Sequence, residues 1–126
     1  MDKHLILLVD DDPMSNTYST LIVKKQNPEA EVLTFNSGVE ALSYLQSPSN
    51  PKPDIIFLDL NMPVMNGWDF MEEYEKLHLG IEVIVVTSSN EHVDKEKSMS
   101  YKGVADYFIK PITLDNVKKL FSRKKI

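Results

Sequence analysis

Two short apolar segments of this chain end in acidic residues. The segment Leu5–Val9 is followed by Asp10 and Asp11, and the segment Ile55–Leu58 is followed by Asp59. Segments of this length and composition are typical of strands buried on both faces of a parallel sheet. A carboxylate is costly inside such a sheet, so we expect these acids at the strand ends, where the sheet meets solvent. Converging carboxylates repel one another, and a divalent cation or a nearby ammonium group relieves that repulsion.

Two further apolar segments, Ile81–Val86 and Val104–Ile109, end in Thr87 and Lys110. Lys110 supplies the ammonium group, and the carboxylates predict an octahedral Mg²⁺ site completed by a carbonyl and waters. Between these two positive charges, Asp59 becomes a nucleophile toward phosphorus and forms an acyl phosphate. Phosphoryl transfer needs mainly positioning and charge neutralisation, which the metal, Lys110 and the Thr87 hydroxyl supply together.

Helical segments separate these strands and a further short strand at Glu31–Phe35. Asp12 is predicted as an N-cap because Pro13 suits the first helical position, and Ser37 and Thr113 are predicted to cap two later helices. The first helix shows helical spacing of its apolar residues (Met14, Tyr18, Leu21 and Ile22), and the third helix is predicted to run from the Asn66–Gly67 turn to Gly80. The fourth helix, roughly 91–101, is weakly amphipathic, so we expect it to be held less firmly than the others.

Five strand–helix units in strict alternation predict an α/β fold, with a parallel sheet and helices on both of its faces. In such sheets a ligand site lies beyond the carboxyl ends of the strands, at the point where the strand order reverses. The residues predicted at those ends are Asp10, Asp11, Asp59, Thr87 and Lys110. The chemistry and the fold therefore point to the same place.

Composition limits the remaining function classes. A chain of 126 residues with a net charge of −5 predicts a single domain, 1–126, with no electrostatic case for a nucleic-acid or membrane partner. The chain contains no cysteine, which excludes disulfides and thiolate chemistry and is compatible with a reducing cytoplasm. No apolar stretch approaches membrane-spanning length. We expect a cytoplasmic protein.

From Leu5 to Phe121 the sequence resembles the response-regulator receiver domains of two-component signalling. Each motif alone is weak, but five of them in this order are highly specific. They are Val9-Asp10-Asp11, Leu58-Asp59-Leu60-Asn61-Met62-Pro63, Asn66-Gly67, Thr87-Ser88 and Tyr107-Phe108-Ile109-Lys110-Pro111. The resemblance implies a flavodoxin-like (βα)5 fold, doubly wound, with strand order 2-1-3-4-5. We expect a stand-alone receiver, without the output domain that is usually fused to such domains.

The same resemblance assigns roles to the strand-end residues. Asp59 accepts a phosphoryl group from a histidine kinase or a histidine phosphotransfer protein. Asp11, Asp59 and the main-chain carbonyl of Asn61 ligate Mg²⁺, and Asp10 acts through a water molecule. Lys110 pairs with the carboxylate and later with the phosphoryl group. On this basis the chain is not an enzyme in its own right, because it promotes only its own phosphorylation and dephosphorylation.

A switch and an output surface are also implied. Thr87 and Tyr107 form the switch pair: Thr87 moves toward the phosphoryl group, and the Tyr107 ring then turns inward. The fourth helix, fifth strand and fifth helix form the face that binds an unknown downstream protein. The Lys110–Pro111 peptide bond is expected to be cis, and the side chains of Asn61 and Ser89 border the path of the water that attacks the acyl phosphate.

Two other classes of protein compete with this interpretation. Haloacid-dehalogenase-type phosphatases also use a phosphate-accepting aspartate, but on the first strand and with a second acid two residues later. Here Asp59 belongs to the third predicted strand, and the residue two positions later is Asn61. A flavin- or nucleotide-binding module of the same fold needs a phosphate loop after the first strand, where Asp10 and Asp11 would repel phosphate.

Overall fold

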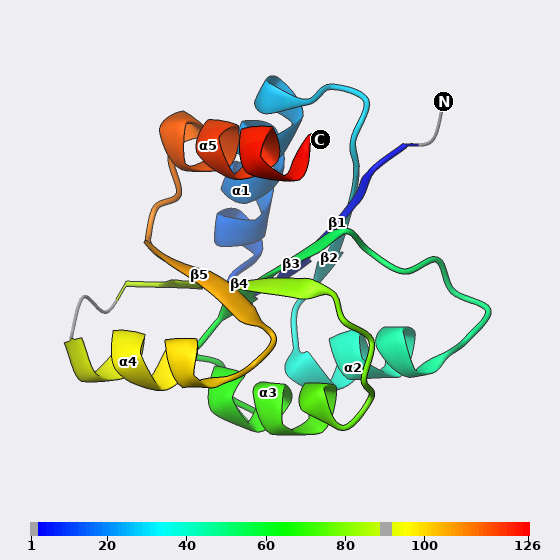
Figure 1. The fold of residues 1–126 in the computed structure, drawn as a ribbon, viewed down its shortest axis with the longest axis vertical. Coiled ribbons are helices and arrows are strands. Elements are labelled where there is room, and N and C mark those ends of the chain that lie inside the picture. Colours follow the sequence, from blue (N-terminus) through cyan, green and yellow to red (C-terminus); the bar gives the residue numbers. More distant parts are fainter. Residues whose placement is uncertain (1–2, 89–91) are drawn as a thin grey trace.

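The computed structural model describes residues 3–88 and 92–126, in which five strands alternate with five helices (Figure 1). None of the described helices is long and apolar enough to cross a membrane. The strands are β1 (Leu5–Val9), β2 (Glu31–Phe35), β3 (Ile55–Asp59), β4 (Glu82–Thr87) and β5 (Val104–Ile109). The helices are α1 (Pro13–Gln26), α2 (Gly38–Gln46), α3 (Gly67–Glu75), α4 (His92–Ser100) and α5 (Leu114–Lys124).

All five strands belong to one parallel sheet with the order β2-β1-β3-β4-β5. The chain moves outward from β1 to β2, then returns to the other side of β1 and continues through β3, β4 and β5. Because parallel crossovers are right-handed, this reversal divides the helices between the two faces. Helices α1 and α5 cover one face, and α2, α3 and α4 cover the other (Figure 1). The predicted flavodoxin-like (βα)5 fold and strand order are confirmed.

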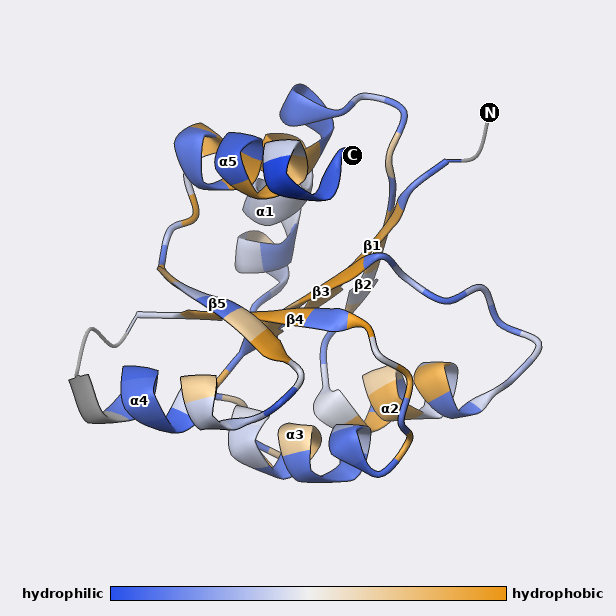
Figure 2. Cartoon of the chain, in the orientation of Figure 1, coloured by the Kyte–Doolittle hydropathy of each residue, from blue (hydrophilic) through white to orange (hydrophobic). Residues whose placement is uncertain are grey.

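Strands β1 and β3 are buried along their whole length, as their apolar sequences predict. Alternate side chains point to opposite faces of the sheet. Leu7 and Leu58 face the core under α2 and α3, whereas Ile6 and Phe57 face the core under α1 and α5. Figure 2 shows largely hydrophobic strands between helices that contain both hydrophilic and hydrophobic residues. This packing fixes the carboxyl ends of β1 and β3 side by side.

The predicted helix caps are all present. The Asp12 side chain accepts a hydrogen bond of 3.0 Å from the Met14 amide, and Pro13 occupies the first position of α1. The Ser37 and Thr113 side chains likewise accept backbone N–H groups in the first turns of α2 and α5. These caps begin three helices just beyond the strand ends, which holds the intervening loops close to the edge of the sheet.

The apolar spacing of α1 predicts the helix but not its buried face. Met14 is 81% exposed and Leu21 is 67% exposed, whereas the buried residues of this helix are Asn16 and Val23. The spacing of the exposed apolar side chains is the same as that of a core-facing stripe, so sequence alone does not separate the two. The consequence is an apolar strip on the outer side of α1.

Helix α3 ends at Glu75, five residues before the predicted stop at Gly80. The Leu77 amide bonds back to the Tyr74 carbonyl, which tightens the last turn, and His78 then adopts a φ of 51°. A residue in this left-handed region ends the helical hydrogen-bond pattern. Gly80, with a φ of 71°, lies in the loop that leads to β4 rather than at the end of the helix.

Candidate functional site

Four strands deliver polar side chains to the same edge of the sheet. Asp10 follows β1, Asp59 ends β3, Thr87 ends β4 and Lys110 follows β5. The side chains of Asp10, Asp59 and Thr87 are buried although they are polar. Strands β1 and β3 are neighbours at the point where the strand order reverses, so the two acids meet where this fold places its ligands.

Three carboxylates and one ammonium group form the centre of the cluster. Asp10, Asp11 and Asp59 each offer an oxygen within 4.8 Å of the others. The Lys110 Nζ atom lies 2.7 Å from Oδ2 of Asp10 and 3.6 Å from Oδ2 of Asp59. The Lys110 amide donates to the Thr87 carbonyl at 2.8 Å, which fastens the loop after β5 to the end of β4. The structure thus brings together the five strand-end residues predicted from the sequence.

The acidic residues after β1 divide their tasks. One carboxylate oxygen of Asp10 accepts the Asp12 amide at 2.9 Å, and the other faces Lys110. Asp12 caps α1, as predicted, and therefore turns away from the cluster to the helix. Asp11 is exposed and offers an oxygen to the cluster. Within this run, Asp10 and Asp11 belong to the site and Asp12 belongs to the helix.

Burial raises the pKa of the Asp59 carboxyl to about 6, and the negative charges of Asp10 and Asp11 add to that effect. The Lys110 charge and the hydrogen bond from the Asn61 amide act in the opposite direction. Burial also disfavours the charged form of Lys110, but its hydrogen bonds and charge interactions with Asp10 and Asp59 outweigh this effect and raise its pKa. One ammonium group therefore leaves the three carboxylates with excess negative charge.

The donor atoms of the cluster suit a hard divalent cation. All are carboxylate oxygens, and Mg²⁺ prefers oxygen ligands and retains several waters. A cation beside Asp59 would also remove the charge repulsion that raises its pKa. The residues present therefore fit Mg²⁺.

Asn61 connects the β3 loop to the end of β4. Its backbone amide donates to Oδ1 of Asp59 at 3.2 Å, and its side-chain Nδ2 donates to Oγ1 of Thr87 at 3.3 Å. The register is consistent with this contact, because Asp59 lies opposite Val86 and Asn61 and Thr87 follow two and one residues later in their strands' direction. Asn61 thus contacts both the predicted phosphoacceptor and the predicted switch threonine.

Tyr107 occupies the interior in this structure. Its side chain is 9% exposed and belongs to the core on the α2, α3 and α4 side of the sheet. The inward position that the resemblance assigns to the switched state is thus already adopted, and the position of this ring alone does not separate the two states. The Lys110–Pro111 peptide bond is cis, as the resemblance implies. Ser89 lies outside the described residues.

Asn16 is a buried polar residue that the sequence analysis did not single out. Its Nδ2 atom donates to the Asp10 carbonyl at 2.9 Å and to Oδ1 of Asn36 at 3.2 Å. These bonds tie α1 to the end of β1 and to the loop after β2. The available signal was its spacing of seven residues from Val23, which places both on one helix face, but its polarity suggested the solvent side.

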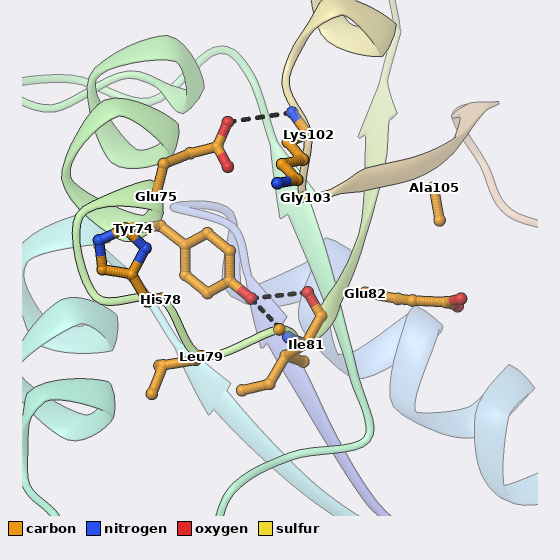
Figure 3. Close-up of a pocket in the computed structure, with 10 residues that line it drawn as sticks. Tyr74, Glu75, His78, Leu79, Ile81, Glu82, Lys102, Gly103 and Ala105 are labelled. Carbon is orange, nitrogen blue, oxygen red and sulfur yellow. Dashed lines mark hydrogen bonds between the residues drawn. The ribbon is translucent and has the colours of Figure 1, made fainter.

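A hollow of about 460 Å³ lies at the opposite edge of the sheet (Figure 3). Among its lining residues, the Tyr74 hydroxyl donates to the Ile81 carbonyl and accepts from the Ile81 amide. The Glu75 carboxylate accepts a hydrogen bond from the Lys102 amide. These residues adjoin the amino ends of β4 and β5, whereas Asp59 lies at a carboxyl end. The hollow is therefore separate from the acidic cluster.

Trp68 joins α3 to α4. Its ring stacks on the Tyr101 ring with a centroid separation of 6.2 Å, and the Lys97 ammonium lies 4.6 Å from its centroid. The Trp68 side chain is partly exposed and packs between helices. This contact holds the C-terminal half of α4 against α3.

Comparison with known proteins identifies the class to which this chain belongs. The family model of the response regulator receiver domain matches residues 6–122. This chain belongs to the response regulator receiver domain family. Receiver domains of this family generally bind Mg²⁺.

Two curated relatives illustrate the proteins in which such domains occur. The probable C4-dicarboxylate response regulator DctR of Halalkalibacterium halodurans is 30% identical over 113 residues, which are 90% of this chain and 47% of that protein. The sensor histidine kinase RcsC of Escherichia coli is 32% identical over 117 residues, which are 93% of this chain and 12% of that protein. The chain therefore spans less than half of the length of either relative.

Solved structures agree in fold. A two-component response regulator from Cytophaga hutchinsonii superposes with a TM-score of 0.84 at 25% identity, covering 98% of this chain and 97% of that one. A two-component response regulator from Legionella pneumophila also gives a TM-score of 0.84, at 28% identity and 98% coverage of both chains. The similarity thus extends over nearly the whole length of these two structures.

Proposed function

We propose that this chain is a phosphoacceptor in a two-component phosphorelay and that Asp59 receives the phosphoryl group. The observation that carries the proposal is a buried carboxylate at a strand end, flanked by Asp10, Asp11 and the Lys110 ammonium group. A nucleophile held in this way needs no separate base, because an ionised carboxylate attacks directly. The donor is a phosphohistidine of a histidine kinase or of a histidine phosphotransfer protein.

The transfer conserves the phosphoryl group. An oxygen of Asp59 forms a bond to phosphorus while the bond between phosphorus and the donor imidazole nitrogen breaks, and the electron pair of that bond stays on the nitrogen. Lys110, 3.6 Å from the Asp59 carboxylate, is placed to neutralise charge on the phosphoryl oxygens. In the later hydrolysis, a water oxygen bonds to phosphorus, the bond to Asp59 breaks, and inorganic phosphate leaves.

Bound Mg²⁺ supplies further positive charge to the phosphoryl oxygens in this site. The carboxylates of Asp11 and Asp59 and the main-chain carbonyl of Asn61 would hold it, and Asp10 would act through a water molecule. The distances support this division of roles, because Asp10 already pairs with Lys110 at 2.7 Å. Asp11 is exposed and has its oxygen in the cluster, so it is accessible to a hydrated cation.

The chain acts on itself and is not an enzyme for a separate substrate in this proposal. It works in the cytoplasm, where histidine kinases obtain ATP, and its partners are proteins rather than nucleic acid or membrane. A phosphatase of the haloacid-dehalogenase type would hydrolyse a small phosphomonoester with turnover. This receiver would show no such turnover.

Intact-mass spectrometry tests the acceptor directly. After incubation with acetyl phosphate and Mg²⁺, the wild-type chain should gain one phosphoryl group, and Asp59→Asn should gain none because an amide is not a nucleophile toward phosphorus. Asp54→Asn is the matched control, since Asp54 lies at the other end of β3 and should leave uptake intact. An unmodified wild type, or a modified Asp59→Asn, would contradict the proposal.

The output surface is proposed to be the face formed by α4, β5 and α5. Phosphorylation adds roughly 1.5 to 2 negative charges to the pocket. Thr87 ends β4, the strand that pairs with β5, in which Tyr107 lies opposite Val85. Of the described side chains within α4, only Ser98 is buried, so the repacking of this helix disturbs little of the core.

Hydrogen exchange should locate this output surface. On addition of beryllofluoride and Mg²⁺, amide exchange should slow more across α4 and β5 than across α2, because α2 packs mainly against α3 and β2, and β2 is the edge strand opposite β5. Thr87→Ala should weaken that response and leave phosphoryl uptake largely intact. If the largest change falls on α2 instead, the proposed output face is wrong.

A further inference from the structure

The hydrogen bond between the side chains of Asn61 and Thr87 has no role in the function proposed above. There Asn61 acts through its main-chain carbonyl, toward Mg²⁺, and the family resemblance places its side chain only beside the path of water. In the structure, however, the side-chain Nδ2 atom donates to Oγ1 of Thr87 at 3.3 Å. The predicted switch threonine is therefore held by the loop that carries the predicted phosphoacceptor.

The surroundings of Thr87 hold its backbone in place, so the side-chain hydroxyl is the group whose orientation can change. Its side chain is fully buried, and its backbone carbonyl accepts the Lys110 amide at 2.8 Å. The neighbouring residue Val86 is paired with Asp59 in the sheet. With the backbone fixed in this way, rotation about the Cα–Cβ bond is the movement left to the hydroxyl, and the bond from Asn61 acts on that rotation.

We propose that the Asn61 amide is a positioning group that holds the Thr87 hydroxyl in its resting orientation and thereby sets how readily the receiver switches. A threonine hydroxyl has one proton and two acceptor lone pairs. The Asn61 N–H group occupies one of these lone pairs and fixes the direction of the oxygen. We expect Thr87 to turn toward a phosphoryl oxygen on Asp59 in order to donate to it, and this movement breaks the bond to Asn61, so that bond favours the resting state.

The inference rests on the proposed function and is tested with a mimic that is not hydrolysed, so that switching is separated from the lifetime of the acyl phosphate. Beryllofluoride with Mg²⁺ is titrated into the wild-type chain and into Asn61→Ala, and the resonances of α4 and Tyr107 are followed by NMR. The half-saturating concentration should fall by about 3- to 10-fold in Asn61→Ala, the range expected for loss of one neutral hydrogen bond from the resting state.

A double-mutant cycle separates this role from a merely structural one. In a Thr87→Ala background, Asn61→Ala should cause no further change, because the hydroxyl that it positions is gone. Asn61 is exposed and its replacement leaves no cavity, so Asn61→Ala should lower the melting temperature by no more than the loss of this one hydrogen bond explains.

Each other result has a distinct meaning. An unchanged or raised half-saturating concentration in Asn61→Ala overturns the positioning role, and an equal fall in the Thr87→Ala background overturns the route through Thr87. A wild-type chain that takes up neither beryllofluoride nor a phosphoryl group overturns the proposed function instead. The two failures are therefore distinguishable.

Discussion

Replacement of Asp59 by asparagine should raise the free energy of unfolding at neutral pH when divalent cations are removed. Burial and the neighbouring acids raise the pKa of this carboxyl to about 6 in the folded chain, against about 3.9 in an unfolded one. Ionisation therefore opposes folding. Asparagine keeps an oxygen that can accept the Asn61 amide but has no charge, so it removes that opposition.

The sign of the pH dependence follows from proton binding. Between about pH 4 and pH 6 the folded chain holds a proton on Asp59 that the unfolded chain has lost, so the stability of the wild type falls as pH rises through this window. Above about pH 6 the stability of the wild type does not fall further from this cause. The stabilising effect of Asp59→Asn should therefore be absent near pH 4 and reach on the order of 1–3 kcal/mol near pH 7.

Urea unfolding at several pH values in EDTA measures this difference. Asp115→Asn is the matched control, because Asp115 is an exposed carboxylate of α5 paired with Lys119, and its effect should stay within a few tenths of a kcal/mol. Added Mg²⁺ should stabilise the wild type and reduce the advantage of Asp59→Asn. A stability difference between wild type and Asp59→Asn that does not vary between pH 4 and pH 7 would contradict the assigned cause.

Replacement of Asp11 by alanine should lower the affinity for Mg²⁺ by about tenfold or more, corresponding to about 1.4 kcal/mol or more. Asp11 is exposed and contributes an oxygen and a negative charge to the cluster. Its loss removes a ligand without breaking a helix cap. In EDTA the fold should be undisturbed, since the charge of Asp11 adds to the repulsion on Asp59.

Asp12→Ala provides the opposite pattern. The Asp12 side chain caps α1 through the Met14 amide, so its removal should cost about 1 kcal/mol of stability and leave Mg²⁺ affinity nearly unchanged. Calorimetric titration and thermal unfolding of both variants give the two quantities. Equal Mg²⁺ affinities in Asp11→Ala and Asp12→Ala would contradict the assignment of Mg²⁺ binding to Asp11 and of helix capping alone to Asp12.

Most of the architecture was predictable because it depends on local patterns. Short apolar segments that end in polar residues marked the strands, and the alternation with helices implied that their ends meet at one edge of a sheet. Side-chain contacts between elements were not predictable in this way. The buried face of α1 is an example, since exposed Met14 and Leu21 have the spacing expected of core residues.

The contacts of Asn16 and Asn61 show the same limit. Each side chain bonds to a residue on another element, Asn16 to the Asp10 carbonyl and Asn61 to the Thr87 hydroxyl. Such bonds depend on strand register and on the rotation of helices about their axes, which a single sequence does not record. The early end of α3 is a related case, because His78 rather than a glycine takes the left-handed conformation that ends the helical pattern.

The stack of Trp68 and Tyr101 has an optical consequence. Trp68 is the only tryptophan of the chain, and its ring lies between α3 and the end of α4, beneath the Lys97 ammonium group. Indole emission responds to nearby charge and to water, so any displacement of α4 alters both influences on one fluorophore. The native chain thus carries its own spectroscopic label on the helix proposed to transmit the signal, and stopped-flow fluorescence can time that movement without chemical modification.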